Sequence, residues 1–237
     1  YNYYEDLQVR RYGAHGISHE YVSKRAAELM GKDVKDVNLI TLHLGNGASL
    51  SAVEGGVCVN TSMGFTPLAG VMMGTRTGDI DPAVVTYVMR KLNISAEEVL
   101  DTFNKKSGMA GVSGLSSDAR DIEAAIKEGN ERAILTRKMY AQKVLEYVGA
   151  YKMQLGHVDA LVFTAGLGEN DSGTRAAILD ALKEGLHVEY DKELNEQVKG
   201  EERRISTDDS EVEVWVVPTN EELVIAQDAY RIHNETK

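Results

Sequence analysis

The fold is decided by residues 38–61, which read NLITLHLGNGASLSAVEGGVCVNT. A run rich in leucine and β-branched residues, 38–44, ends at the turn 45–47, and an alternating run, 48–54, follows it. Gly55 and Gly56 then lead into a third run, 57–61. Short β-rich runs joined by tight glycine turns are typical of hairpins. We therefore predict three consecutive strands in an antiparallel meander.

Helical spacing and capping signals surround this meander. Residues 18–30 repeat apolar side chains at helical intervals, with Gly31 as a stop. An Asp-Pro start and a Ser-Ala-Glu-Glu capping box predict two further helices in quick succession, whereas the Gly- and Ser-rich stretch 107–117 is predicted to be a loop. The predicted starts and later helices are Asp81-Pro82, Ser95, a helix capped by Asp118 and reaching Glu128, and 131–155 with Gly156 as its end.

The second half of the chain alternates between strands and helices. Residues 158–164 are a predicted strand, 165–168 a glycine turn, and 174–184 a helix. A last strand, 212–217, passes through Thr219 and Asn220 into a closing helix. This order indicates an α/β fold with a mixed sheet flanked by helices, and its ligand site is expected at the carboxyl ends of the strands.

Composition narrows the classes of function. The chain has 237 residues, 43% of them hydrophobic and 27% charged, which is typical of a packed globular protein. Its 26 basic and 37 acidic residues give a net charge of -11, which argues against nucleic-acid and anionic-membrane partners. The basic pair Arg203-Arg204 is predicted to lie in a solvated loop. The single cysteine, Cys58, excludes disulfide frameworks and cysteine-rich zinc sites and fits a reducing cytoplasm, and neither a membrane span nor a signal peptide is recognisable.

Three glycine-rich stretches are candidates for phosphate binding, because main-chain N–H groups can approach a phosphate closely where no side chain obstructs them. They are 43–47, 166–168 and 111–114. A glycine turn at the end of a strand is often only a turn, so the pattern alone leaves both interpretations open.

Three of the six histidines lie in the first fifth of the chain: His15, His19 and His43. His43 stands directly before the glycine turn, where an imidazole donor could face a bound phosphate. The alternative is that His19 and His43 are hydrogen-bonded core residues. A zinc site built on His15 and His19 lacks a third ligand with a metal-site pattern.

Two charged positions are also candidates. Arg76 lies in the loop 73–79 between two glycines, and holding an arginine there suggests an anionic ligand, although a salt bridge to Asp79 or Asp81 would serve equally well. Glu221 follows Asn220 at a predicted helix start. It could be simple capping chemistry or a carboxylate that holds magnesium against phosphates.

Five motifs in order resemble the acetate kinases, and they span nearly the whole chain: residues 11–22, 43–49, 72–82, 163–170 and 218–222. The resemblance implies the ribonuclease H-like lobe of the superfamily that contains actin, heat-shock ATPases and sugar kinases. It implies the second, C-terminal nucleotide-binding lobe at residues 31–237, with 1–30 leading in from a first lobe. Such a lobe would belong to a cytoplasmic, homodimeric enzyme that transfers phosphate between ATP and acetate, giving ADP and acetyl phosphate, with Mg²⁺.

The resemblance also assigns roles to residues. His15 and Arg76 would steady the phosphoryl group, and Glu221 would help to place magnesium. The residues expected to hold phosphate and nucleotide are His43, Leu44, Gly45, Asn46, Gly47, Asp118, Ala119, Arg120, Gly166, Leu167, Gly168, Glu169 and Asn170. A carboxylate acceptor is already ionised, so no strong general base is required.

Two departures affect the surroundings of His15. Ala14 stands where the family usually has phenylalanine, and Ile17 stands where it usually has threonine. Because the family's first lobe supplies other phosphate and acyl contacts, we expect the chain alone to show negligible turnover. Propionate or butyrate kinases remain alternatives, as does a non-catalytic nucleotide-binding or dimerisation module that uses the apolar face of 131–155.

Overall fold

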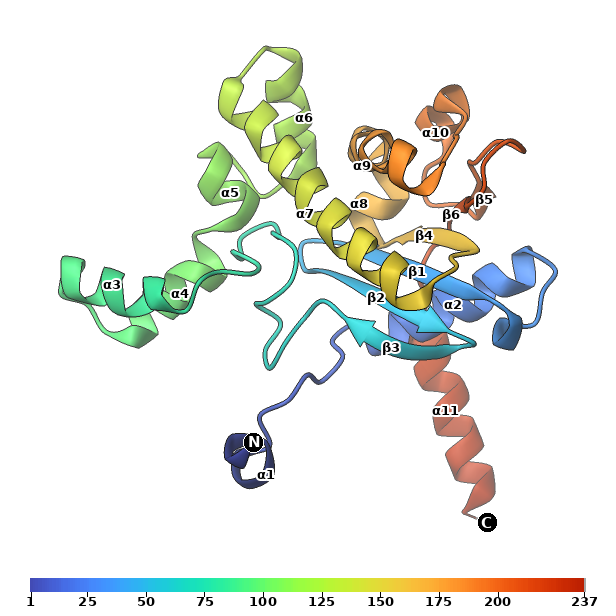
Figure 1. Cartoon of the computed structure of the whole chain (residues 1–237), viewed down its shortest axis with the longest axis horizontal. Coiled ribbons are helices and arrows are strands. Elements are labelled where there is room, and N and C mark those ends of the chain that lie inside the picture. Colours follow the sequence, from blue (N-terminus) through green and yellow to red (C-terminus); the bar gives the residue numbers. More distant parts are fainter. Residues whose placement is uncertain (237) are drawn as a thin grey trace.

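A computed structural model describes residues 1–236 and contains one six-stranded sheet in the order β3-β2-β1-β4-β6-β5 (Figure 1). β1, β2 and β3 form the predicted antiparallel meander, whereas β1, β4 and β6 are parallel and β5 pairs antiparallel with β6. The predicted mixed sheet is confirmed. The strands are β1 (Asn38–Leu44), β2 (Ala48–Glu54), β3 (Val57–Thr61), β4 (Ala160–Thr164), β5 (Arg203–Arg204) and β6 (Glu213–Val216).

The helices follow the local capping signals closely. Ser95 and Glu98 form the predicted capping box, Asn130 caps the longest helix, and Gly156 ends it. The α-helices are α1 (Asn2–Leu7), α2 (Gly16–Leu29), α3 (Ala83–Leu92), α4 (Ala96–Lys105), α5 (Gly108–Ser113), α6 (Ala119–Lys127), α7 (Glu131–Leu155), α8 (Ala165–Asn170), α9 (Ser172–Leu186), α10 (Lys192–Gln197) and α11 (Glu221–Glu235), and Val34–Asp36 is a 3₁₀ turn.

The central strands β1, β2 and β4 are buried on both faces, whereas the edge strand β3 is largely exposed. α7 and α9 cover one face, where Tyr140, Val144 and Val148 of α7 pack on the strands. α2 covers the other face through Val22 and Ala26 (Figure 1). Burial of the strands' apolar side chains on both faces is the main stabilising contribution to this arrangement.

Several predictions were wrong in detail. Residues 108–113 form α5 rather than a loop, because Met109 N and Ala110 N donate to Met73 O (2.8 Å) and Gly74 O (2.9 Å) and so fix the segment from outside. The predicted turn at 165–168 opens the short helix α8. Arg203 and Arg204 form an edge strand that pairs with β6, not a loop. Pro82 is the N-cap of α3 rather than its first residue, and Asp81 Oδ1 accepts from Ala83 N.

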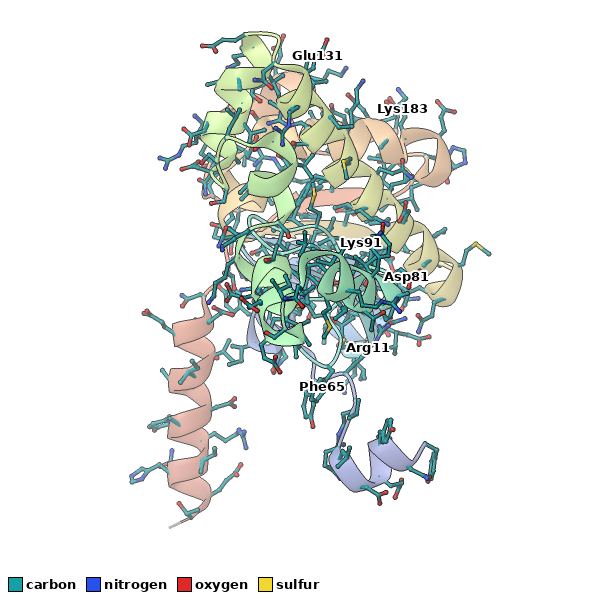
Figure 2. The ribbon with its side chains drawn as sticks, turned by 90° about the vertical axis from the view of Figure 1, so that its left-hand side faces the viewer. Arg11, Phe65, Asp81, Lys91, Glu131 and Lys183 are labelled. Atoms are coloured by element: carbon teal, nitrogen blue, oxygen red, sulfur yellow. The ribbon has the colours of Figure 1, made fainter. Side chains whose placement is uncertain are left out.

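Two helices extend away from the body of the molecule. α1 and α11 project to the same side, and Figure 2 shows Phe65 on the part of the body nearest α1. The exposed large apolar residues at the two ends include Tyr1, Tyr3, Leu7, Tyr230 and Ile232. Among residues 1–236, no helix is long and apolar enough to cross a membrane.

Candidate functional site at the carboxyl edge of the sheet

The turn between β1 and β2 forms the floor of the candidate site. Gly45 N donates to Gly47 O at 3.0 Å, which closes the turn and removes Gly45 as a free donor. Within residues 1–236, no acceptor is recorded for the main-chain N–H of Asn46 or of Gly47. Two unpaired N–H groups on a partly exposed turn are suitable donors to an anion.

Gly47 is the point at which the predicted catalytic residues meet. A Cβ on Gly47 would lie 3.3 Å from Arg76 Nη1 and 3.6 Å from His15 Nε2. The structure therefore brings His15, Arg76 and the glycine turn together, although the first two are 61 positions apart in the sequence. A methyl group on Gly47 would be in tight contact with the guanidinium, which would have to shift slightly to accommodate it.

Arg76 has no carboxylate partner among the described residues, so the alternative of a salt bridge to Asp79 or Asp81 is not formed. Its Nη1 donates to Pro67 O at 2.9 Å and approaches Met73 Sδ at 3.7 Å. Asp79 instead accepts from Gly70 N and Tyr147 Oη, at 2.9 and 2.5 Å. A half-buried guanidinium without a counter-ion is suited to binding an anion.

The three histidines have different surroundings. His19 is a core residue whose two nitrogens bond Thr41 Oγ1 and Ser49 Oγ, both at 2.7 Å. The His43 ring stacks on His15 with centroids 3.9 Å apart, and its Nδ1 bonds Ser18 Oγ at 2.8 Å. His43 Nε2 remains on the side of Gly45, 3.8 Å from the position of a Cβ there. The core interpretation is confirmed for His19, and His43 combines a core bond with a nitrogen facing the turn.

Burial controls the charge of these rings. Desolvation lowers the pKa of His19 to about 3, with smaller contributions from His43 and His15, and it lowers the pKa of His43 to about 3, with His15 adding to the effect. The pKa of His15 is also lowered, first by burial and then by the positive charge of Arg76. Neutral rings are therefore expected at neutral pH, and Arg76 supplies the fixed positive charge.

Two residues at the site have a strained backbone. His15 precedes α2 with φ of 63°, and Ala165 joins β4 to α8 with φ of 64°. The other positive-φ residues that are not glycine, Gln8, Asn93 and His187, are helix C-caps, where this conformation is common. His15 and Ala165 lack that explanation, and strain outside caps is concentrated at functional sites.

α8 closes the site from the β4 side. Ala165 Cβ lies 3.7 Å from the position of a Cβ on Gly45, so the start of α8 touches the turn. Glu169 Oε1 accepts from Ala165 N at 2.7 Å and from Thr219 N at 3.2 Å, and thereby joins the ends of β4 and β6. Gly166 is exposed with open space above it, whereas Gly168 is buried against Phe163. Leu167 and Asn170 lie on the same short helix, and Asn170 Nδ2 donates to Gly166 O at 3.1 Å.

Asp118, Ala119 and Arg120 lie at the start of α6 and form a rim of the site. Asp118 caps α6, and its carboxylate binds the guanidinium of Arg120, with Nη2 to Oδ2 at 2.6 Å. The hydrogen bonds from Arg120 lower the pKa of Asp118 to about 2. Ser117 Cβ and Asn46 Oδ1 both lie against Gly74, so this rim adjoins the glycine turn. The third predicted glycine stretch, 111–114, lies instead at the end of α5.

Glu221 follows the carboxyl end of β6. It is the first residue of α11, is exposed, and its side chain makes no hydrogen bond or ion pair within residues 1–236. The nearby Thr219 Oγ1 is buried without a hydrogen-bond partner. No group of three or more His, Cys, Asp or Glu side chains that could hold a metal ion occurs among those residues.

Ser18, Thr41 and Ser49 were missed as site residues in the sequence. Their signal was weak: Ser49 lies opposite His43 in the β1–β2 register, and Thr41 lies two residues before His43 on the same strand. Small polar residues on buried strand positions are a sign of an internal hydrogen-bond network.

The fold is an α/β lobe in which a glycine turn, two stacked histidines and an arginine meet at the carboxyl edge of a mixed sheet. The carboxyl ends of strands in such sheets are where ligands commonly bind. Comparison with known proteins is in agreement. The acetokinase family model matches residues 1–227, and the chain belongs to that family.

Individual relatives give the same result. Acetate kinase 2 of Listeria monocytogenes is 53% identical over 99% of this chain, and the chain covers 58% of that protein. The crystal structure of Porphyromonas gingivalis acetate kinase superposes with a TM-score of 0.93 at 48% identity, covering 98% of this chain and 58% of that one. A propionate kinase from Francisella tularensis gives a TM-score of 0.89 at 38% identity, covering 96% and 57%. The chain thus spans less than two thirds of the length of these relatives.

Proposed function

We propose that this chain is the nucleotide- and phosphate-binding lobe of an acetate kinase, which transfers a phosphoryl group between ATP and acetate. The observation that carries the proposal is the convergence of Gly47, His15 and the unpaired Arg76 on one point. Phosphoryl transfer requires little covalent chemistry from the protein, and its rate comes from aligning the reactants and neutralising the charge on the transferred group.

Each part of the pocket has a role in this proposal. Arg76 and the N–H groups of Asn46 and Gly47 hold the phosphoryl oxygens, and His15 lies beside them. The nucleotide lies between the rim at residues 118–120 and α8, passing over the exposed Gly166. Acetate is ionised at neutral pH, so the neutral histidines are not needed as bases.

Mg²⁺ is the metal we propose with the nucleotide. Magnesium keeps several waters and is usually held by one or two carboxylates together with substrate phosphates. Glu221 is a free carboxylate at the carboxyl edge of the sheet, and the buried Thr219 Oγ1 beside it lacks a partner, so the chemistry of this corner fits such an ion. The metal would neutralise phosphate charge, and Glu221 would orient its hydration shell.

Calorimetry with MgADP tests the nucleotide half of the proposal. We expect weak but saturable binding by the chain, with ¹⁵N chemical-shift changes at Gly166 and Ala119. In parallel, an assay of ATP plus acetate with hydroxylamine trapping should detect negligible acetyl phosphate, because the chain covers 58% of its relatives' length. No binding at millimolar MgADP would contradict the proposed nucleotide site, and robust turnover would contradict the proposed incompleteness.

The acyl group is the part of the proposal with a specific rival. The similarity to a propionate kinase at 38% identity keeps a longer carboxylate as the second candidate. Activity of the complete protein on acetate, propionate and butyrate would separate the two by their relative kcat/KM.

A non-catalytic dimerisation module is supported less well. The apolar face of α7 that suggested it is largely used by the core, since Tyr140, Val144, Val148, Tyr151 and Leu155 are buried in the single chain. Homodimerisation is still part of our proposal for the complete enzyme. Sedimentation at high concentration tests it for this chain.

A further inference from the structure

A chain of buried hydrogen bonds runs behind His15. Thr41 Oγ1 bonds His19 Nδ1 at 2.7 Å, His19 Nε2 bonds Ser49 Oγ at 2.7 Å, and Ser49 Oγ bonds His15 Nδ1 at 2.8 Å. Thr41 and Ser49 are 0% exposed and His19 is 3% exposed, so water is excluded from these bonds. We call this chain of side chains, from Thr41 to His15, the histidine relay.

The hydrogens available in the relay determine its direction, that is, which atom donates and which accepts in each bond. The Ser49 hydroxyl has one hydrogen, so it can donate to only one of its two histidines and must accept from the other. If both rings are neutral, His15 and His19 must therefore carry their hydrogens on corresponding nitrogens, either both on Nε2 or both on Nδ1. Ser49 couples the tautomers of the two rings.

Thr41 selects between the two directions. Its only recorded side-chain partner within residues 1–236 is His19 Nδ1. If Thr41 donates to that nitrogen, every hydrogen of the relay is used and His15 carries its hydrogen on Nε2. In the opposite direction, the Thr41 hydroxyl hydrogen would be buried without an acceptor, which is unfavourable. The first direction is therefore favoured.

We propose that Ser49, supported by His19 and Thr41, is a positioning residue that fixes His15 as its Nε2–H tautomer, so that the neutral ring donates a hydrogen bond into the pocket between Gly47 and Arg76. His15 Nε2 lies 3.6 Å from the position of a Cβ on Gly47, on the side of the pocket where Arg76 Nη1 also lies. The step from this donor to a phosphoryl oxygen rests on the proposed function. The tautomer itself does not.

The charges around His15 make the tautomer important. Arg76 faces the ring from the loop 73–79, His43 stacks on it from β1, and His19 lies behind it on α2. Burial and Arg76 both lower the pKa of His15 and so disfavour the doubly protonated ring. Only the Nε2–H tautomer of a neutral imidazole can donate toward a bound anion, because the other tautomer presents a lone pair that would repel it.

The test is two-bond ¹H–¹⁵N NMR of the ligand-free chain with ¹⁵N-labelled histidine at pH 7.5, which distinguishes protonated from bare ring nitrogens. His15→Gln and His19→Gln variants assign the signals. We expect Nε2–H tautomers for both rings. Ser49→Ala should shift the tautomer ratio of His15 toward Nδ1–H by roughly two- to tenfold, the equivalent of one hydrogen bond.

Matched variants distinguish a role of Ser49 in positioning His15 from a role in packing. Ser51→Ala removes a buried hydroxyl two residues along the same strand that bonds Thr61 Oγ1 at 3.3 Å and lies outside the relay, so the His15 ratio should stay unchanged. Ser49→Thr keeps the hydroxyl and should retain the Nε2–H tautomer. Thr41→Val removes the hydroxyl at the far end and should shift both rings together, which provides a second measurement if Ser49→Ala does not fold.

An Nδ1–H tautomer for His15 in the unaltered chain would overturn the proposal. An unchanged His15 ratio in folded Ser49→Ala or Thr41→Val protein would do the same. Because these spectra need no ligand, a chain that shows the expected tautomers and fails to bind MgADP would contradict the proposed function alone.

Discussion

The two halves of the site differ in how much the fold arranges them before any ligand arrives. In the inner half, His15, His43 and Arg76 meet at Gly47 and are supported by buried partners. In the outer half, Arg120 is exposed and bound to Asp118, and Glu221 has no recorded partner among residues 1–236. The inner half is preorganised, whereas in our proposal the outer half rearranges on binding. Substitution of buried supports should therefore affect stability, and substitution of ligand-facing or exposed side chains should affect affinity.

Arg175 provides the strongest test of this division, because it is a buried support beneath the outer half. Its side chain is fully buried and donates to Asn195 Oδ1 (2.8 Å), Gly168 O (3.0 Å), Asn195 O (2.6 Å) and Val198 O (3.0 Å). Burial lowers its pKa to about 10. Arg175→Met should lower the free energy of unfolding by about 3–5 kcal/mol, because it leaves several buried acceptors without donors.

Urea denaturation measures this loss, and Arg231→Met, on the exposed α11, is the control that should leave the unfolding midpoint unchanged. A loss below about 1 kcal/mol for Arg175→Met would show that other donors or water can satisfy the three carbonyl groups. α8 would then depend less on this buried arginine than the hydrogen bonds indicate.

Acid should destabilise the inner half through its histidines. The folded-state pKa of His19 and of His43 is about 3, below the ordinary value of 6.5, so the unfolded chain binds more protons between these pH values. Stability is therefore present above pH 6.5 and is lost as the pH falls toward about 3, with a slope of up to about 1.4 kcal/mol per pH unit for each ring.

The variant His19→Gln cannot titrate and should lower this slope by about 1.4 kcal/mol per pH unit between pH 4 and 6, as measured by urea denaturation at each pH. His233→Gln, on α11, is the control for loss of a histidine elsewhere. An identical slope in His19→Gln and the unaltered chain would mean that His19 can be protonated in the folded state over this pH range.

Anion binding should depend on Arg76. Arg76→Gln keeps a hydrogen-bond donor but removes the charge, and hydrogen bonds to charged groups contribute about 1.5–3 kcal/mol, so inorganic phosphate should bind roughly tenfold or more weakly. Phosphate titration followed by the His15 ring signals measures this. Arg90→Gln, on α3, is the matched control, and equal phosphate affinity in both variants would remove Arg76 from the anion site.

The sequence predicted the parts of the fold that are encoded locally. The capping box at Ser95 and Glu98 and the Asp118 cap are complete within a few residues, and the glycine turns of the meander are equally local. α5 could not be predicted from its glycines and serines, because donors in that segment bond Met73 and Gly74 more than thirty positions earlier. β5 likewise exists only through its pairing with β6.

The candidate site shows the same distinction between local and distant contacts. The resemblance identified His15 and Arg76 as site residues. Their convergence at Gly47 depends on contacts between a loop and a sheet that lie far apart in sequence. The role of Ser49 depends on a bond to His19, 30 positions away, so no local pattern reveals it. The ion pair between Asp118 and Arg120 is local, yet a helix cap and a nucleotide contact have the same sequence signal.

Arg120 should affect binding without affecting stability. Exposed ion pairs contribute little to folding, so Arg120→Gln should leave the unfolding midpoint unchanged. If the guanidinium leaves Asp118 to contact the nucleotide, MgADP affinity should fall several-fold by calorimetry. Arg231→Gln removes a similarly paired, exposed arginine on α11 and should leave that affinity unchanged. Unaltered affinity in Arg120→Gln would confine the Arg120 side chain to its ion pair with Asp118.

Gly166 gives the smallest and most specific test of the outer half. A Cβ on Gly166 meets nothing within 4 Å, and its backbone is not in the left-handed region, so Gly166→Ala should leave the ligand-free fold and its stability intact. A nucleotide lying directly over α8 would meet the added methyl group, and MgADP should then bind a few-fold more weakly. Gly185→Ala, at an equally open position on α9, is the matched control. Equal MgADP affinity in the two variants would place the nucleotide away from Gly166. The nucleotide would then have to lie nearer Asp118.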